Sequence, residues 1–369
     1  MKILEVANVD FSLRQFVLPL MRAAREAGHE VIGVSADGPL LADLRAEGFR
    51  VETIPFARAL SPSAHLRAFR ALRRLIRAER PDLVHAHMPI SGFLARLAAR
   101  SLGVRRVAYT CHGFLFKQEG SRARRWVAFV MEFLGGRLTD VFLTVSAEEA
   151  ADARRLGIFA TPVAVGNGRD PALFRPDPEA RARLRAALGT PPEQVVVLAA
   201  SRLVRTKGYP ELAAAMRAVP SAELWVVGER LASDPGPDMV AVLEAAGLGA
   251  RLRRLGYRAD MQAVMAAADI FTLPSYFEGL PVSVIEAMLC GLPVVASDIP
   301  GPREQVVSGE TGLLVPAHDA PALAAALARL AADGALRARM GAAGRARAVA
   351  LFDERKVIDR TLDLLGLRV

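Results

Sequence analysis

The chain has 369 residues, of which 52% are hydrophobic, enough to build two α/β domains of ordinary size. No apolar run reaches the roughly 20 residues that cross a bilayer, and the first residues predict a strand and not a signal peptide, so we expect a cytoplasmic protein. Its two cysteines, Cys111 and Cys290, lack metal-type spacing and predict reduced, buried thiols.

The net charge of +9 is concentrated in the first half of the chain. Residues 1–165 hold 24 Lys and Arg against 16 Asp and Glu, a net +8, which leaves +1 for the remainder. A basic domain indicates an anionic partner, which can be nucleic acid, an anionic membrane or a phosphate-bearing substrate. Arg and Ala are abundant throughout the chain, so part of the excess reflects general composition.

The first half alternates short β-rich runs with amphipathic helical runs. Strands are expected at residues 3–7, 31–35, 50–54, 83–87, 106–111 and 141–145, and helices at 16–27, 40–47, 66–80, 93–102 and 147–156. Repeated alternation of this kind is typical of a parallel, doubly wound sheet.

Gly, Asn and Pro interrupt the pattern near residues 163–171, and an irregular segment continues to residue 178. A second β–α series follows, with strands expected at 195–201, 223–227, 252–255, 270–274, 293–297 and 312–315. The sequence therefore predicts two Rossmann-like α/β domains, residues 1–165 and 166–352. An amphipathic run at about 353–369 is expected to form a helix that packs back on the first domain.

Two glutamates in the second half, Glu278 and Glu286, are the most informative residues. The first follows the apolar run 270–274, which predicts a buried strand, and the second lies one to two turns into the helix expected next. A turn with Gly279 and Pro281 joins them. Since ligands of open α/β sheets bind beyond the carboxyl ends of the strands, both carboxylates are expected in one crevice, accepting hydrogen bonds from sugar or ribose hydroxyls.

Two cations, Arg202 and Lys207, flank the turn between the strand at 195–201 and the following helix. Gly208 would allow the backbone to approach a ligand closely. A helix N-terminus with two cations is suited to a diphosphate, whereas the alternative is an exposed cationic loop. Because the glutamate pair occurs in the same half of the chain, we favour the diphosphate interpretation.

Taken together, these motifs strongly resemble family-4 glycosyltransferases, and the resemblance runs continuously through the second half. It implies the GT-B fold, in which two Rossmann-like domains face across a cleft, with the nucleotide-sugar donor on the second and the acceptor on the first. It also implies transfer with retention of anomeric configuration and without a metal. The residues that carry it are Arg202 with Lys207, Glu278-x7-Glu286, Gly291-Leu-Pro-Val-Val-Ala-Ser297, Gly309-Glu-Thr-Gly-Leu-Leu-Val-Pro316, Asn167-Gly168 and Phe174-Arg-Pro176.

The resemblance implies roles for single residues. Arg202 and Lys207 would clamp the diphosphate and stabilise the leaving group, which agrees with the absence of any Asp-x-Asp triplet from the chain. Glu278 would bind sugar hydroxyls, and with His112 these are the expected catalytic residues. The expected donor-binding residues are Glu286 at the ribose, Gly279, Leu280 and Pro281 in the turn, and Gly228, Glu229, Tyr257 and Arg258 near the base, where ordinary strand-end glycines are an equal alternative.

Three further positions of the first domain are expected near the acceptor. The loop after the first strand lacks the glycines that many relatives carry, and Ser12 and Arg14 are expected in their place. His85 and His87 alternate on one strand like a metal pair, but no third ligand is evident nearby, so no metal site is predicted and His87 is assigned to the acceptor side. His112 has a capping or core histidine as its alternative. No Gly-x-Gly-x-x-Gly occurs in this loop, so no dinucleotide cofactor is expected.

Two basic segments of the first domain predict contact with an anionic membrane. One places cations before the aromatic, apolar run 126–134, and the other is a helix with arginines on one side and Leu66, Phe69, Leu72 and Ile76 on the other. A core-packing helix with solvated arginines is the alternative for both, and nucleic acid is the weaker interpretation because interleaved aromatic residues are lacking. The arginines are Arg122, Arg124 and Arg125 in the first segment, and Arg67, Arg70, Arg73, Arg74, Arg77 and Arg80 in the second.

The sequence thus predicts a retaining, metal-independent glycosyltransferase at the inner face of the cell membrane. It would move a hexose or N-acetylhexosamine from a UDP-sugar, which is a substrate and not a cofactor, to a lipid-linked or glycan-precursor acceptor. A donor nucleotide with a purine base in place of uracil is an open alternative. The alternatives are a UDP-sugar epimerase or a nucleotide-sugar-binding protein of the same fold.

Overall fold

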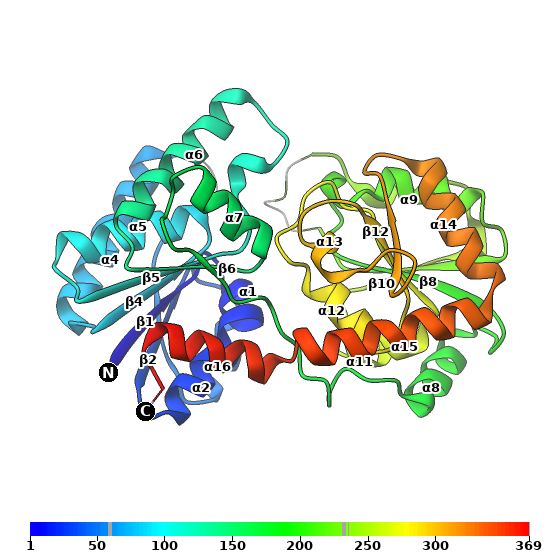
Figure 1. Ribbon diagram of the computed structural model, residues 1–369, viewed down its shortest axis with the longest axis horizontal. Coiled ribbons are helices and arrows are strands. Elements are labelled where there is room, and N and C mark those ends of the chain that lie inside the picture. Colours follow the sequence, from blue (N-terminus) through cyan, green and yellow to red (C-terminus); the bar gives the residue numbers. More distant parts are fainter. Residues whose placement is uncertain (58–60, 231–233, 235, 369) are drawn as a thin grey trace. The chain divides into compact units, whose positions relative to one another are not determined.

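The computed structural model describes residues 1–57, 61–230, 234 and 236–368. The chain divides into two compact domains, Met1–Gly166 with Val357–Val369, and Asn167–Lys356. Each contains one parallel β-sheet with helices on both faces (Figure 1). None of the described helices combines the length and the apolar character that crossing a membrane requires.

The sheet of the first domain has the strand order β3-β2-β1-β4-β5-β6-β7, and each pair of neighbours is parallel. The chain winds outward from β1 to β3 and then returns to add β4 on the other side of β1, so the winding reverses between β1 and β4. The strands are β1 (Lys2–Val6), β2 (Glu30–Ser35), β3 (Arg50–Thr53), β4 (Leu83–His87), β5 (Arg106–Cys111), β6 (Val141–Thr144) and β7 (Val163–Ala164).

Helices cover this sheet on both faces because the winding reverses. Residues of α2 and α16 pack with β1 on one face, and residues of α4 and α5 pack on the other. The described helices are α1 (Asp10–Ser12), the π-helix η1 (Leu13–Val17), α2 (Leu18–Glu26), α3 (Leu41–Ala46), α4 (Pro62–Glu79), α5 (Pro89–Ser101), the 3-10 helix η2 (Leu115–Lys117), α6 (Arg122–Arg137), α7 (Ala147–Arg155) and α16 (Glu354–Leu365).

The second domain repeats the plan with the order β10-β9-β8-β11-β12-β13, and its winding reverses between β8 and β11. Its strands are β8 (Val195–Ala200), β9 (Ala222–Val227), β10 (Leu252–Gly256), β11 (Ile270–Leu273), β12 (Val294–Ser297) and β13 (Gly312–Val315). Its described helices are α8 (Pro178–Leu188), η3 (Arg205–Lys207), α9 (Tyr209–Arg217), α10 (Met239–Ala245), η4 (Gly249–Arg251), α11 (Met261–Ala267), α12 (Val282–Leu289), α13 (Pro302–Gln305), α14 (Ala320–Ala332) and α15 (Gly334–Leu351).

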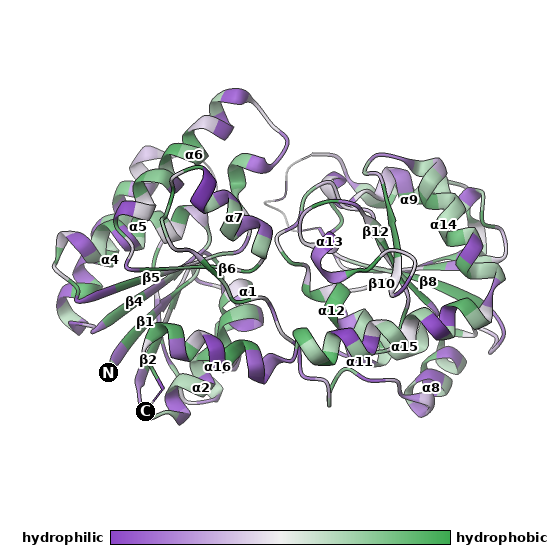
Figure 2. Ribbon diagram, viewed as in Figure 1, coloured by the Kyte–Doolittle hydropathy of each residue, from purple (hydrophilic) through white to green (hydrophobic). Residues whose placement is uncertain are grey.

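The C-terminal helix completes the core of the first domain. Leu362 and Leu365 of α16 and Leu367 beyond it are buried with Ile3, Leu20 and other residues of β1, β2 and α2. The strands carry the hydrophobic residues and the outward helix faces the hydrophilic ones (Figure 2). Since successive strand residues point to opposite faces, β1 contributes Leu4 and Val6 to one face and Ile3 to the other.

The expected doubly wound sheets are confirmed, and the expected strands agree with the structure within about one residue at each end. No residue range was predicted for several helices of the second domain, namely α8, α10, α11, α13, α14 and α15. The expected loop after the first strand is largely helical, because α1 begins at Asp10 and η1 follows from Leu13. In α4 the buried stripe consists of Ala64, Ala68, Leu72 and Ile76. Leu66 was expected on the same side as Leu72 and Ile76, which was wrong, because Leu66 lies outside this stripe and is exposed.

Candidate active site

The loops that follow β8 and β11 form the centre of the candidate site in the second domain. These strands are neighbours, and the sheet reverses its winding between them. Arg202 and Lys207 lie on the loop after β8, which leads into α9, and Glu278 lies on the loop after β11, which leads into α12. In open α/β sheets, ligands bind beyond the carboxyl ends of the strands at such a reversal point.

Close backbone packing holds these two loops together. Gly208 has a φ of 73°, and a Cβ added to it would lie 1.9 Å from the carbonyl oxygen of Pro274. The N–H of Tyr276 donates a hydrogen bond of 2.9 Å to the carbonyl of Thr206. A side chain at position 208 would force the loops apart, which gives this glycine a specific role.

Lys207 and Glu278 meet directly across the two loops. Nζ of Lys207 lies 2.6 Å from Oε1 of Glu278, and both side chains are largely buried. The pair therefore keeps an ammonium and a carboxylate at the reversal point with little solvent around them. An anionic ligand could share the ammonium, and a ligand hydroxyl could donate to the second carboxylate oxygen.

The turn between Glu278 and α12 leaves backbone donors available. Asn167 donates to the carbonyl of Leu280 at 2.6 Å, and Gln305 donates to the carbonyl of Pro281 at 2.9 Å. Within the described residues, the N–H groups of Gly279 and Leu280 form no hydrogen bond. Oxygen atoms of a phosphate or sugar are suitable acceptors for such N–H groups before a helix N-terminus.

Glu286 lies on α12, 6% exposed, and forms an ion pair with Arg169. Nε of Arg169 lies 2.8 Å from Oε1 of Glu286. Burial raises the pKa of Glu286, although the charge and hydrogen bond of Arg169 act in the opposite direction. Arg169 was not identified from the sequence, where only the preceding Asn-Gly signalled this segment. Its guanidinium orients the carboxylate that was assigned to the ribose.

The structure does not bring the two expected diphosphate cations together in one contact. Nη1 of Arg202 lies 2.5 Å from Oδ1 of Asp234, and more than half of the Arg202 side chain is exposed. Lys207 instead contacts Glu278. Arg202 is therefore held at the exposed side of the loop by an acidic residue that the sequence did not identify.

The four residues expected near the base lie where β9 and β10 end. The N–H of Gly228 donates to the carbonyl of Gly256 at 2.9 Å, and the N–H of Tyr257 donates to Oε1 of Glu229 at 3.3 Å. The Tyr257 side chain is exposed, whereas Arg258 forms a two-point ion pair with Asp260. Tyr257 and Glu229 are thus the exposed residues of this set.

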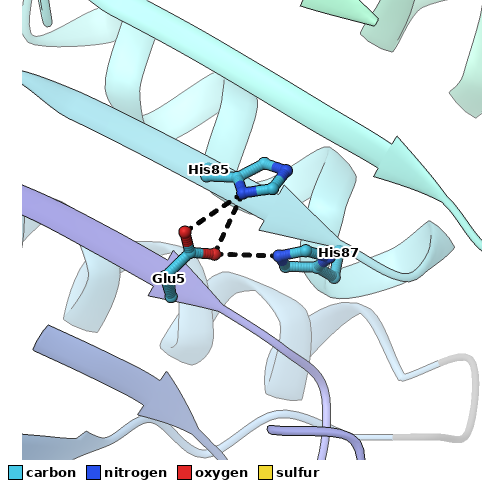
Figure 3. Close-up of side chains that lie close together, drawn as sticks. All are labelled: Glu5, His85 and His87. Atoms are coloured by element: carbon cyan, nitrogen blue, oxygen red, sulfur yellow. Dashed lines mark hydrogen bonds and ion pairs between the residues drawn. The ribbon is translucent and has the colours of Figure 1, made fainter. Parts of the chain in front are cut away.

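A buried polar cluster occupies the corresponding reversal point in the first domain. Glu5 of β1 lies between His85 and His87 of the neighbouring β4 (Figure 3). Oε2 of Glu5 is 3.0 Å from Nδ1 of His85 and 2.9 Å from Nε2 of His87. The prediction that these histidines have no third potential ligand nearby was wrong, because Glu5 completes a group of three whose ligand atoms lie within 4.8 Å of one another.

Alternation along three parallel strands produces this cluster. Glu5, His85 and Thr110 follow Ile3, Leu83 and Ala108 by two residues each and therefore share their sheet face. Nε2 of His85 lies 2.8 Å from Oγ1 of Thr110. A glutamate inside the otherwise apolar run at residues 3–7 was the available signal, since a buried carboxylate needs partners.

His112 joins the cluster through His87. Its Nε2 lies 3.1 Å from Nδ1 of His87, and its ring also approaches Phe16. Burial and His85 lower the pKa of His87 to about 4, although Glu5 acts in the opposite direction. Burial and the two neighbouring imidazoles lower the pKa of His112 well below its usual range. Both rings are therefore neutral at pH 7.

The two remaining acceptor-side residues have separate environments. Ser12 is buried at the end of α1, and Arg14 forms an ion pair with Asp43 of α3, with Nε 2.5 Å from Oδ2. Neither residue contacts the histidine cluster through a hydrogen bond or ion pair in the described part of the chain.

Comparison with known proteins places this architecture in a family. Residues 13–168 match the model of the glycosyl transferase 4-like domain, and residues 180–347 match that of glycosyl transferases group 1. The chain is 30% identical to the putative glycosyltransferase EpsD of Bacillus subtilis over 98% of this chain and 96% of the relative. The chain therefore belongs to the family-4 glycosyltransferases of the GT-B fold.

Individual relatives carry more specific names. The chain is 28% identical to a Campylobacter jejuni N,N'-diacetylbacillosaminyl-diphospho-undecaprenol alpha-1,3-N-acetylgalactosaminyltransferase, over 99% of this chain and 98% of the relative. The fold matches that of Anabaena HepE, solved in complex with UDP-glucose, with a TM-score of 0.85, 25% identity and 99% coverage of both chains. It also matches the sucrose-phosphate synthase of Thermosynechococcus elongatus, with a TM-score of 0.85, 24% identity and coverage of 99% and 98%.

Replacing Gly208 by Ala is expected to separate the loops after β8 and β11. Gly189→Ala is a matched control, because Gly189 also has a positive φ, 64°, but no atom within 4 Å of the added Cβ. Both variants lose about 1 kcal/mol from left-handed backbone strain. Only Gly208→Ala is expected to lower the rate of glycosyl transfer, by roughly 10²-fold from misplaced groups. A glycosyl-transfer assay and thermal unfolding measure both effects, and equal transfer rates would contradict this arrangement.

Proposed function

We propose that this protein transfers a hexose or N-acetylhexosamine from a UDP-sugar to a lipid-linked sugar acceptor, with retention and without a metal. The observation that carries the proposal is the reversal point of the second domain, where the Lys207–Glu278 pair lies beside the unbonded N–H groups of Gly279 and Leu280. Cation, amide donors and carboxylate together match a sugar diphosphate. An aromatic ring at Tyr257 and the oriented carboxylate of Glu286 match the nucleoside.

The proposed chemistry depends on charge stabilisation. As the bond between sugar and diphosphate breaks, negative charge grows on the departing UDP. Lys207 and the N–H groups of Gly279 and Leu280 stabilise this charge in a poorly solvated site. Glu278 accepts hydrogen bonds from sugar hydroxyls, and its negative charge also favours the positive charge that develops on the sugar ring. Arg202, released from Asp234, adds a second cation at the exposed side.

The relatives support a lipid-linked acceptor. Besides the Campylobacter enzyme, a relative from Escherichia coli is named UDP-Gal:alpha-D-GlcNAc-diphosphoundecaprenol alpha-1,3-galactosyltransferase, with 28% identity over 89% of this chain and 86% of the relative. Both names combine a sugar transfer with an undecaprenyl-diphosphate acceptor. We therefore place the acceptor of this protein in the same chemical class.

Removing the Lys207 ammonium is expected to abolish most donor binding. Lys207→Ala should weaken UDP-sugar binding by roughly 10- to 100-fold, the size of one charge-assisted hydrogen bond. Arg217→Ala, an exposed cation at the end of α9, is the control and should bind as the unmodified protein does. UDP or GDP release is measured over a panel of nucleotide-sugars, with and without polyprenyl-diphosphate-sugar acceptors.

Three outcomes separate the possible activities. UDP release that depends on the lipid acceptor supports the transferase. Conversion of the donor sugar without UDP release would identify an epimerase and overturn the proposal. Unchanged turnover in Lys207→Ala would show that Lys207 does not bind the diphosphate.

We further propose that α6 docks on an anionic membrane. Its polarity is inverted: the charged residue Glu132 is 1% exposed, whereas Trp126, Val127 and Leu134 are 66%, 40% and 48% exposed. Oε1 of Glu132 accepts a hydrogen bond from Tyr109, and Oε2 lies 3.3 Å from Nη2 of the buried Arg96. The ion pair fixes the inner side of the helix, so the apolar side faces outward.

The arginines beside this apolar face indicate the occupant. The exposed residues Arg122, Arg124 and Arg125 lie in the first turn of α6, and Arg137 lies in its last turn. Tryptophan with flanking arginines is typical of helices that lie at the level of anionic headgroups. The exposed arginines of α4, such as Arg70 and Arg74, add to the positive charge of the same domain.

Replacing two of the outward apolar residues is expected to release the protein from vesicles. Trp126→Ala with Leu134→Gln removes two side chains, each worth about 1.5–3 kcal/mol when buried, so binding should fall at least tenfold. Leu173→Gln, equally exposed but in the second domain, is the control. Sedimentation with phosphatidylglycerol vesicles measures binding, and neutral phosphatidylcholine vesicles test the charge. Equal binding of both variants would contradict docking through α6.

A further inference from the structure

We infer that Glu5 is a positioning residue that acts through His87 to fix the tautomer of His112, so that Nδ1 of His112 is presented as a hydrogen-bond acceptor to a substrate hydroxyl. The inference rests on the proposed function for the identity of the substrate. The chain of hydrogen bonds itself follows from the arrangement of Glu5, His87 and His112 alone.

Glu5 sets the direction in which the hydrogen bonds from Glu5 through His87 to His112 are donated. This side chain is fully buried, and its described partners are the two imidazoles of β4. Burial alone would raise the pKa of Glu5, but the charge and hydrogen bond of His85, together with those of His87, outweigh it and lower the pKa to about 2. An ionised carboxylate only accepts hydrogen bonds. The nitrogen that faces it, Nε2 of His87, must therefore carry a proton.

The next two steps follow from the neutrality of the rings. A neutral imidazole with a proton on Nε2 has a lone pair on Nδ1. Nδ1 of His87 faces Nε2 of His112 at 3.1 Å, so Nε2 of His112 must donate. His112 then has its own lone pair on Nδ1. Burial disfavours the doubly protonated form of each ring, which would break this order.

The last group in this series of hydrogen bonds, Nδ1 of His112, is available to a ligand. His112 is only half-buried, and its Nδ1 makes no hydrogen bond with any residue that the structure describes. A neutral acceptor nitrogen favours a hydroxyl and disfavours the oxygens of a phosphate, which are acceptors themselves. This polarity therefore favours a sugar hydroxyl as the partner of His112.

The same atoms could in principle hold a metal ion, and the contacts favour the hydrogen-bonded arrangement. The nitrogens of His85 and His87 that a metal would need lie at hydrogen-bond distances from Glu5. The other nitrogen of His85 contacts Oγ1 of Thr110, and that of His87 contacts His112. Each ring thus has both nitrogens engaged, which fixes its orientation without a metal.

Tautomers can be measured directly in the full chain without substrate. Long-range ¹H–¹⁵N correlation on histidine-labelled protein at pH 7, assigned with single His→Gln variants, should show Nε2–H tautomers for His87 and His112. A dominant Nδ1–H form of either residue, or an imidazolium, would overturn the inference. Chelation with EDTA tests the metal: release of stoichiometric metal with altered His85 and His87 resonances would also overturn it.

Glu5→Leu tests the control of the tautomer, and Glu5→Asp keeps the carboxylate. In Glu5→Leu, His112 should populate both tautomers and sugar transfer should fall about tenfold, the worth of one hydrogen bond, with UDP affinity unchanged. A single Nε2–H form in Glu5→Leu would contradict the positioning role. If Glu5→Leu does not fold, the tautomers of the unmodified protein and of Glu5→Asp still decide. Absence of transferase activity in the unmodified protein refutes the proposed function and leaves the tautomer result standing.

Discussion

Reversal of the winding direction in each parallel sheet determines where this protein can place polar groups. The chain leaves β1 and β4 toward helices on opposite faces of the sheet, and the winding reverses in the same way between β8 and β11. Elsewhere in each sheet, helices cover the strands and favour apolar residues. The chemically distinctive residues therefore gather at these two points: Glu5 with His85 and His87 in the first domain, and Lys207 with Glu278 in the second.

The charged groups at both points are buried and paired, and pairing decides what they can do. An unpaired buried charge is costly, so a carboxylate retained there is held by a partner in fixed geometry. Arg169 orients Glu286, Lys207 holds Glu278, and two imidazoles hold Glu5. Such groups need little reorganisation when a ligand arrives, which is how preorganised donors and acceptors contribute to catalysis.

The sequence predicted the strands well and their helical connections less well. Apolar runs bounded by Gly or Pro mark β4, β5 and β11 within a residue, because central strands of a parallel sheet are buried on both faces. The helices α14 and α15 are rich in alanine, and no helix was predicted for their residues. The π-helical turn η1 depends on packing against the sheet, which local composition does not reveal.

The sequence predicted those residues of the candidate site that follow the ends of strands. Positions 202, 207, 278 and 286 follow from strand ends and spacing. Their partners Arg169 and Asp234 come from distant segments, so only the folded chain identifies them. Glu5 is intermediate, because a glutamate within an apolar strand signals a buried partner but not which one.

A crystal structure of the complex with UDP shows whether the reversal point between β8 and β11 holds the sugar diphosphate. We expect diphosphate oxygens about 3 Å from Nζ of Lys207 and from the N–H groups of Gly279 and Leu280, with the ribose hydroxyls at Glu286. UDP bound away from these groups, with Lys207 still paired only with Glu278, would contradict this expectation.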